Sequence, residues 1–97
     1  MNLIYHRNVQ RDVSAVLDYY DEVGGLGLGD AFFAEFMIYV AQAVENPTRF
    51  HLVERDLRRA NLSRFPYHFL FRVQGDTVRI LVVRHNHRAP HYGLTRS

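Results

Sequence analysis

Residues 57–85 read LRRANLSRFPYHFLFRVQGDTVRILVVRH, and they decide the fold because apolar and polar side chains alternate along most of their length. A period of two is typical of β-strands that bury one face. The pattern predicts a two-residue hairpin turn at Gly75-Asp76 and strands over 57–65, 67–74 and 77–85. We therefore expect the carboxyl half of the chain to be an antiparallel sheet.

Placing Gln74 opposite Thr77 sets the register of the last hairpin. One face then carries pairs that we expect in the core: Val73 with Val78, Phe71 with Ile80, Phe69 with Val82 and Tyr67 with Arg84. The other face carries Arg72 with Arg79, Leu70 with Leu81 and His68 with Val83, and continues to His85. Facing arginines oppose folding unless solvent screens them or an anionic partner binds. We expect this second face to be the binding face.

Two amphipathic helices are expected before this sheet, after a short strand over residues 3–5. Asn8 is placed to cap the first helix, whose apolar stripe is Val9, Val13, Val16, Leu17 and Tyr20. The glycine-rich stretch 24–29 lacks the Gly-Lys-Ser/Thr ending of a P-loop, so it indicates a helix-hairpin turn. The second helix carries a stripe that we interpret as core: Phe32, Phe33, Phe36, Met37, Val40 and Val44.

These elements predict an α+β fold in one domain spanning residues 1–97, with the order β-α-α-β-β-β. We expect the helical hairpin to pack on one face of the antiparallel sheet, with the N-terminal strand at an edge. No other part of the chain offers an apolar stripe to cover the sheet. A polar tail from about Gly93 is expected to be mobile.

Charge is divided unevenly along the 97 residues. Residues 1–48 have a net charge of −5 and residues 49–97 a net charge of +7, and every basic residue is arginine. The second half is therefore a candidate anion-binding surface, and lysine-based catalysis is excluded. The chain contains no cysteine, and we find no export leader or membrane-length apolar run, so we expect a soluble cytoplasmic protein.

The densest cluster of chemically capable side chains is residues 84–92, RHNHRAPHY. His85, His87 and His91 could in principle ligate a metal, but no nearby carboxylate orients them and the arginines disfavour a cation, so we expect neither metal nor cofactor. Arg88, His85, His87 and Tyr92 are the residue types that metal-free phosphodiester chemistry uses. The same side chains would also bind nucleic acid or an acidic protein without reaction.

The helical hairpin, a terminal Asn-Pro and the sequence LRRANLSRFPYHFLFRVQGDTVRILVVRHNHRAP together resemble the RelE/ParE toxin superfamily over residues 3 to about 92. The family's arginine-rich strand corresponds here to Arg58, Arg59 and Arg64, and its final basic cluster to His85 with Arg88. The resemblance implies a growth-inhibiting toxin of a type II toxin–antitoxin, or plasmid stabilisation, system. It also implies a hetero-oligomer in which a cognate antitoxin neutralises the toxin.

The superfamily has two main activities. RelE-like members cleave messenger RNA on the ribosome, and their catalytic residues would here be Arg88, His85, His87 and Tyr92. ParE-like members poison DNA gyrase without catalysis. This sequence has no lysine, and His68 stands where the nuclease branch would place an arginine, so it resembles the ParE-like group more closely. A binding module that kept the fold and lost the activity is a third interpretation. The candidate binding residues are Arg58, Arg59, Arg64, His68, Arg72, Arg79 and Arg84.

Overall fold

A computed structural model describes residues 1–25 and 27–97, so that Leu26 of the expected glycine-rich turn lies outside the described residues. The elements are β1 (Asn2–Tyr5), α1 (Val9–Val23), α2 (Leu28–Glu45), a 3-10 turn (Pro47–Arg49), β2 (Leu52–Glu54), β3 (Leu57–Asn61), β4 (Tyr67–Gln74) and β5 (Thr77–His85). The fold class is α+β, as expected. Neither helix in the described residues combines the length and the apolar character needed to span a bilayer.

The described strands form one five-stranded sheet in the order β1-β5-β4-β3-β2. The N-terminal strand lies at an edge, as predicted, but it runs parallel to β5, so the expectation of a wholly antiparallel sheet is wrong there. The short edge strand β2 was not predicted, because its three residues are all exposed and show no alternation. It continues the sheet beyond β3 by antiparallel pairing.

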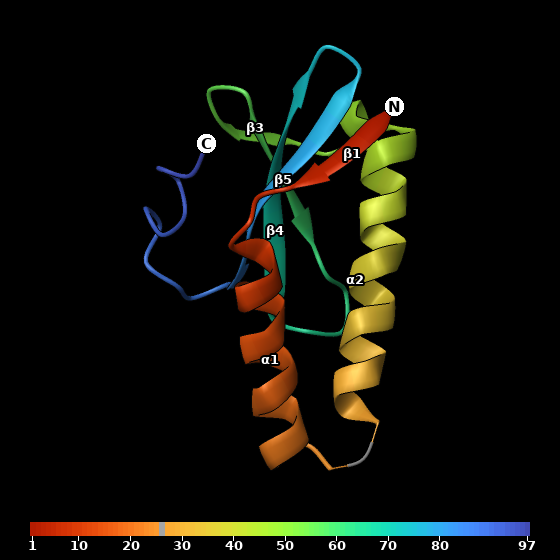
Figure 1. Ribbon diagram of the computed structural model, residues 1–97, viewed down its shortest axis with the longest axis vertical. Helices are drawn as coiled ribbons and strands as arrows, with labels where there is room; N and C mark the ends of the chain where they lie inside the picture. Colours follow the sequence, from red (N-terminus) through yellow and green to blue (C-terminus); the bar gives the residue numbers. More distant parts are fainter. Residues whose placement is uncertain (26) are drawn as a thin grey trace.

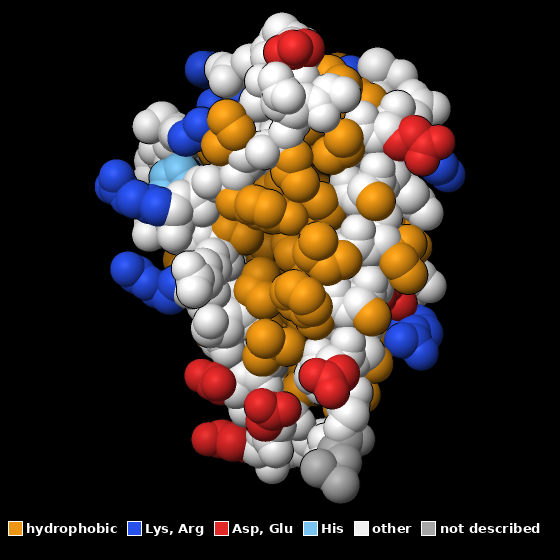
Figure 2. Space-filling model, turned by 45° about the vertical axis from the view of Figure 1, so that its right-hand side comes forward, with side chains coloured by type: hydrophobic (Ala, Val, Ile, Leu, Met, Phe, Trp, Pro, Cys, Tyr) orange, Lys and Arg blue, Asp and Glu red, His pale blue; other side chains and the backbone are white. Residues whose placement is uncertain are grey.

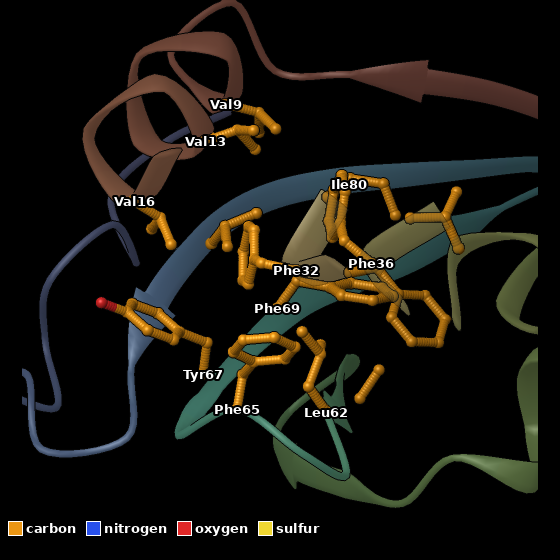
Figure 3. Close-up of a cluster of buried hydrophobic side chains, with 14 of the residues drawn as sticks. Val9, Val13, Val16, Phe32, Phe36, Leu62, Phe65, Tyr67, Phe69 and Ile80 are labelled. Carbon is orange, nitrogen blue, oxygen red and sulfur yellow. The ribbon is translucent and has the colours of Figure 1, made fainter. Parts of the chain in front are cut away.

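The two helices lie side by side on one face of the sheet (Figure 1), as the sequence predicts. Their inner stripes meet the apolar face of β4 and β5 in one core (Figure 3), where Phe32, Phe69 and Ile80 are completely buried. The rings of Phe36 and Phe69 make an edge-on contact with centroids 5.6 Å apart. Burying each such side chain contributes about 1.5–3 kcal/mol, so this layer dominates the stability of the fold.

The stripe of α2 is only partly core. Phe33 and Met37 remain 44% and 39% exposed, which corrects our interpretation of the whole stripe as buried.

The start of α1 also differs from the predicted capping by Asn8. Asn8 is the cap residue, but its side chain makes no capping bond, and Nδ1 of His6 accepts its backbone N–H at 3.1 Å instead.

Strand β3 ends at Asn61, four residues earlier than predicted. The backbone N–H groups of Ser63 and Arg64 donate to one carboxylate oxygen of Glu35 on α2, at 2.7 and 3.0 Å. These amides therefore have a partner outside the sheet, and the chain leaves the strand. Leu62 and Phe65 still lie in the core from this turn, which explains why the apolar pattern continues to residue 65.

The register of the last hairpin is as predicted from Gln74↔Thr77 to Phe71↔Ile80, and then a β-bulge shifts it. Leu81 is the extra residue, so Val82 pairs with Leu70, and Val83 with Phe69. The bulge exchanges the expected faces: Val83 lies in the core under the helices, and Val82 lies on the opposite side. We call that opposite side the back face.

The shift also moves the end of β5. Tyr67 pairs with His85 rather than with Arg84, and His68 pairs with Arg84 rather than with Val83. His85 therefore shares the helix-covered side with Tyr67, not the back face where the sequence pattern placed it. The backbone N–H of Val83 donates to Oδ2 of Asp12 on α1 at 3.0 Å, so this carboxylate stabilises the shifted register.

Residues 86–97, the C-terminal segment, form turns after β5 and lie along the sheet on the side away from α2 (Figure 1). Tyr92 and Leu94 pack on a second apolar cluster on the back face, made of Leu57, Leu70, Leu81 and Val82. Arg96 forms an ion pair with Asp12, with 2.6 Å between Nη1 and Oδ2. The segment that the sequence predicts to be a mobile tail thus has specific contacts, and its mobility stays a prediction.

Candidate functional site

The end of β5 lies beside α1, and the C-terminal segment completes a cleft of about 250 Å³ between them. Its polar and aromatic lining comes from α1, β4, β5 and the C-terminal segment: Asp12, Tyr19, Tyr67, Arg84, His85, Arg88 and Tyr92. Three of the four residues predicted for chemistry, His85, Arg88 and Tyr92, are therefore together. The bulge in β5 is one cause, because it turns His85 toward α1.

His85 is oriented by its neighbours. Its Nδ1 accepts the backbone N–H of His87 at 3.0 Å, so a neutral ring carries its proton on Nε2. The ring makes an edge-on contact with Tyr67, with centroids 5.1 Å apart, and the ring of His87 lies 5.5 Å away. Nε2 is thus the nitrogen that can donate to a bound group. In residues 1–25 and 27–97, no cluster of three or more possible ligand side chains is placed to hold a metal ion.

Arg88 lies over the ring of Tyr92, with its guanidinium carbon 3.9 Å from the ring centroid. A cation–π contact of this kind contributes about 0.5–1 kcal/mol at an exposed site and limits the rotation of the side chain. Among the described residues, no carboxylate lies within ion-pair distance of Arg88. The cleft therefore presents a positioned positive charge next to an imidazole and phenol rings, which suits a phosphate or a carboxylate.

Asp12 does not act as a base in this cleft, because both of its carboxylate oxygens have partners. Oδ2 accepts from the N–H of Val83 and from Nη1 of Arg96, and Oδ1 accepts from Nη2 of Arg96 at 3.1 Å. The side chains of Asp12 and Arg96 are only 4% and 12% exposed. The hydrogen bond to Asp12 raises the pKa of Arg96, so Arg96 stays charged, and its contact with Asp12 joins α1 to the C-terminal segment.

His68 lies on the back face as predicted, but it is buried under the C-terminal segment and only 1% exposed. The Nε atom of Arg84 donates to Nε2 of His68 at 2.9 Å, so Nδ1 must carry the ring proton. Nδ1 lies 2.8 Å from Oδ1 of Asn86 and donates to it. Burial, together with the charges of Arg59 and Arg84, lowers the pKa of His68 to about 4. The ring is therefore neutral at neutral pH.

The arginines of the back face bond within the protein. Nη1 of Arg84 donates to the backbone oxygens of Pro90 and Tyr92 at 2.7 and 2.8 Å. Arg79 donates to the backbone oxygen of Ser97 at 2.5 Å, and Nε of Arg72 lies 3.4 Å from a carboxylate oxygen of Asp56. In the described residues the Nε atoms of both arginines are nonetheless buried without a hydrogen-bond partner, so the contacts with Asp56 and Ser97 compensate the facing pair only in part.

The remaining predicted arginines lie apart from the cleft. Arg59 donates from Nε to the side chain of Asn61 at 2.7 Å. Arg58 pairs opposite Phe71 on the helix-covered side and donates to the backbone oxygen of Phe50 at 2.7 Å. Arg64 contacts Glu35 at 3.1 Å, but its side chain is 65% exposed, so this ion pair contributes at most about 1 kcal/mol.

Sequence reasoning missed the residues that support the cleft, namely Asp12, Tyr19, Tyr67 and Arg96. One signal was available: Asp12 falls within the apolar stripe of α1, between Val9 and Val16, where an acid requires a buried partner. Glu35, between Phe32 and Phe36 on α2, gives the same signal. The identity of the partners could not be read, because Arg96 and Ser63 are distant in sequence.

A second concave surface lies between α1, α2 and the end of β1. This groove has a volume of about 590 Å³, and its apolar lining includes Tyr5, Val13, Leu17, Phe33, Phe36 and Met37. Figure 2 shows a continuous band of apolar side chains along the molecule, with acidic side chains near the hairpin end. An exposed apolar band of this kind is characteristic of a protein–protein contact surface.

No protein-family model matches the chain, and no curated protein matches it. Among solved structures, it is similar to the "Chromosomal ParDE TA system from P. aeruginosa", at 22% sequence identity and a TM-score of 0.77. The superposition covers 88% of this chain and 95% of that chain. The chain therefore has the fold of a protein from a ParDE toxin–antitoxin system.

Proposed function

We propose that this protein is the toxin of a type II toxin–antitoxin pair, a growth inhibitor that a cognate antitoxin neutralises. The observation that carries the proposal is the shared fold, which extends over nearly the whole of a chain from a ParDE system. The groove between the helices supports it, because a small protein that leaves Phe33 and Met37 exposed is suited to a permanent partner.

The groove is the surface that we assign to the antitoxin. An amphipathic helix fits it best, since helix-in-groove recognition buries one apolar stripe in a long apolar channel. The sequence pattern instead indicates the basic back face as the binding face. We now prefer the groove, because the protein's own C-terminal segment occupies much of the back face and engages Arg79 and Arg84.

We propose DNA gyrase as the target. The cleft contains Asp12 but no carboxylate free to orient His85 or to accept a proton, which favours binding over catalysis. The surface around Arg88 would then contact gyrase as part of an interface. Loss of function should be graded over several residues, since an interface has no single proton-transfer step.

Ribosome-dependent cleavage of messenger RNA is the second candidate. It is favoured by the single cleft that holds His85, Arg88 and Tyr92. In phosphodiester cleavage, a guanidinium can stabilise the negative charge of the transition state and an imidazole can donate a proton to the leaving oxygen. In that case Arg88→Ala should lower cleavage by orders of magnitude while the fold is retained, and chelators should have no effect.

One comparison separates these candidates. Purified protein is tested in gyrase supercoiling and with ribosomes translating a defined message, each with and without antitoxin, and its expression is tested for growth arrest. We expect inhibited supercoiling, an intact message and arrested growth. Cleaved message with active gyrase would favour the nuclease. No growth arrest and no effect in either assay would leave a binding module that kept only the fold.

A further inference from the structure

His68 is connected to the cleft without lining it. Its ring lies under the C-terminal segment on β4, and the two ring nitrogens bond to two residues that follow Val83: Nε2 to Arg84 and Nδ1 to Asn86. The backbone N–H of Asn86 donates in turn to the oxygen of Pro66 at 2.9 Å. A single buried imidazole therefore links the start of β4 to both sides of the end of β5.

Arg84 connects His68 to the C-terminal segment, which forms one wall of the cleft. While Nε donates to His68, Nη1 donates to the backbone oxygens of Pro90 and Tyr92. Tyr92 is the ring on which Arg88 lies, at 3.9 Å. The orientation of the Arg84 guanidinium thus determines where residues 88–92 lie relative to His85. The acceptor that fixes this orientation on the Nε side is His68.

The side chain at position 68 must be neutral, accept a hydrogen bond from Arg84 and donate one to Asn86. A protonated imidazole would offer a donor to Nε of Arg84, which is itself a donor, and would place two positive charges together in a buried site. A carboxylate would accept from Arg84 but could not donate to Asn86. A glutamine side chain can extend its amide oxygen to the place of Nε2, whereas the shorter asparagine presents its amide near the place of Nδ1.

We propose that His68 is a positioning residue of the target-binding site: it orients Arg84, and through Arg84 it places Arg88 and Tyr92 at the cleft. The role in target binding rests on the proposed function, because it presumes that the cleft meets the target. The placement of residues 88–92 is a property of the protein alone. The two parts are therefore measured separately.

The test compares His68→Gln, His68→Asn and His68→Leu. Amide hydrogen exchange is followed at Arg88 and Tyr92, whose N–H groups donate to the oxygens of His85 and Ala89. We expect His68→Gln to keep exchange close to that of the parent, because it retains the acceptor for Arg84. His68→Asn and His68→Leu should speed exchange at least tenfold there, while core amides of β4 stay protected. Inhibition of gyrase by the purified variants should follow the same order.

Parent His68 should also show the Nδ1-protonated neutral tautomer in nitrogen NMR spectra. Equal loss in all three variants would mean that the ring serves packing alone, and unchanged exchange in all three would mean that Arg84 needs no acceptor. Either result overturns the positioning role. If the parent protein inhibits no gyrase, the proposed target is wrong, while the exchange data still decide whether His68 positions residues 88–92.

Discussion

At the scale of single residues, Asp12 on α1 connects two distant parts of the chain, the bulged strand β5 and the C-terminal segment. Its carboxylate accepts the N–H of Val83 and binds Arg96, and both charged side chains are almost fully buried. Buried ion pairs are costly to break on one side only, because the remaining charge keeps its desolvation penalty. The bulge, α1 and the C-terminal segment therefore depend on one carboxylate.

Replacing Asp12 with Asn should lower the free energy of unfolding by about 3 kcal/mol, because Arg96 would keep a buried charge without a counterion. The double variant Asp12→Asn with Arg96→Met should recover part of this loss, since the unpaired charge is then removed. Urea unfolding monitored by circular dichroism measures both. The single variant Arg96→Met completes the comparison. If the loss in the double variant equals the sum of the losses in the two single variants, the pair is not energetically coupled.

Residue roles were the hardest to predict from the sequence. Three of the four candidate residues, His85, Arg88 and Tyr92, line one cleft, because residues clustered in eight consecutive positions must lie close together. Their role in chemistry stays a prediction. The contacts of Arg84 and His68 could not be predicted, since they depend on the path of the C-terminal segment. No local pattern indicates that Arg84 donates to the oxygens of Pro90 and Tyr92.

At the scale of elements, strands β4 and β5 were predicted with their observed limits, since two-residue periodicity and a Gly-Asp turn are local signals. The bulge was not predictable. Leu81 and Val82 are both apolar, so they fit either face, and the choice is made by Asp12, which lies about 70 residues earlier in the chain. The early end of β3 depends in the same way on Glu35.

Gly93 holds the C-terminal segment against the sheet. Its φ is +82°, and an added Cβ would lie 2.6 Å from a methyl group of Val82. We expect Gly93→Ala to lower the free energy of unfolding by about 2–4 kcal/mol, the sum of left-handed backbone strain and overpacking. Gly75→Ala is the matched control, because Gly75 has φ +61° with nothing near the added Cβ, and it should cost only about 1–2 kcal/mol. Equal losses in urea unfolding would mean that the contact with Val82 is readily relieved.

The proposed assignment of the groove to the antitoxin predicts that antitoxin binding can be separated from target binding. Met37→Glu places a charge in the apolar lining, so we expect at least a tenfold weaker affinity for the antitoxin with unchanged inhibition of the target. Ile38→Glu is the control, because Ile38 is the next residue of α2, 57% exposed and absent from the lining. Calorimetric titration measures both. A larger effect of Ile38→Glu would move the antitoxin to the outer surface of α2.

At the scale of the whole molecule, stability should fall on acidification. Burial lowers the pKa of His68 to about 4 and also lowers the pKa of His6. Burial opposes ionisation of Glu35, but its hydrogen bonds from Arg64 and Ser63 outweigh burial and lower its pKa. In each case the unfolded state binds the proton more tightly, so protonation favours unfolding.

The contribution of His68 is fully present above pH 6.5 and is lost as the pH falls toward 4, at no more than about 1.4 kcal/mol per pH unit. Glu35 adds a further loss below about pH 4.5. Urea unfolding at pH 7.5, 6.0 and 5.0 should show a decreasing midpoint, with a smaller slope in His68→Gln. A midpoint independent of pH in this window would contradict the neutral, buried state of His68.

The parallel pairing of β1 with β5 also has a consequence for synthesis. Strand β1 pairs in the sheet with residues 77–80 of β5, so it cannot join the sheet until those later residues have been translated. The ion pair of Asp12 forms later still, because it requires Arg96. A message interrupted before the codons for β5 would yield a chain that lacks the partner of β1. On the proposed toxin function, we expect such fragments to be harmless to the cell that makes them.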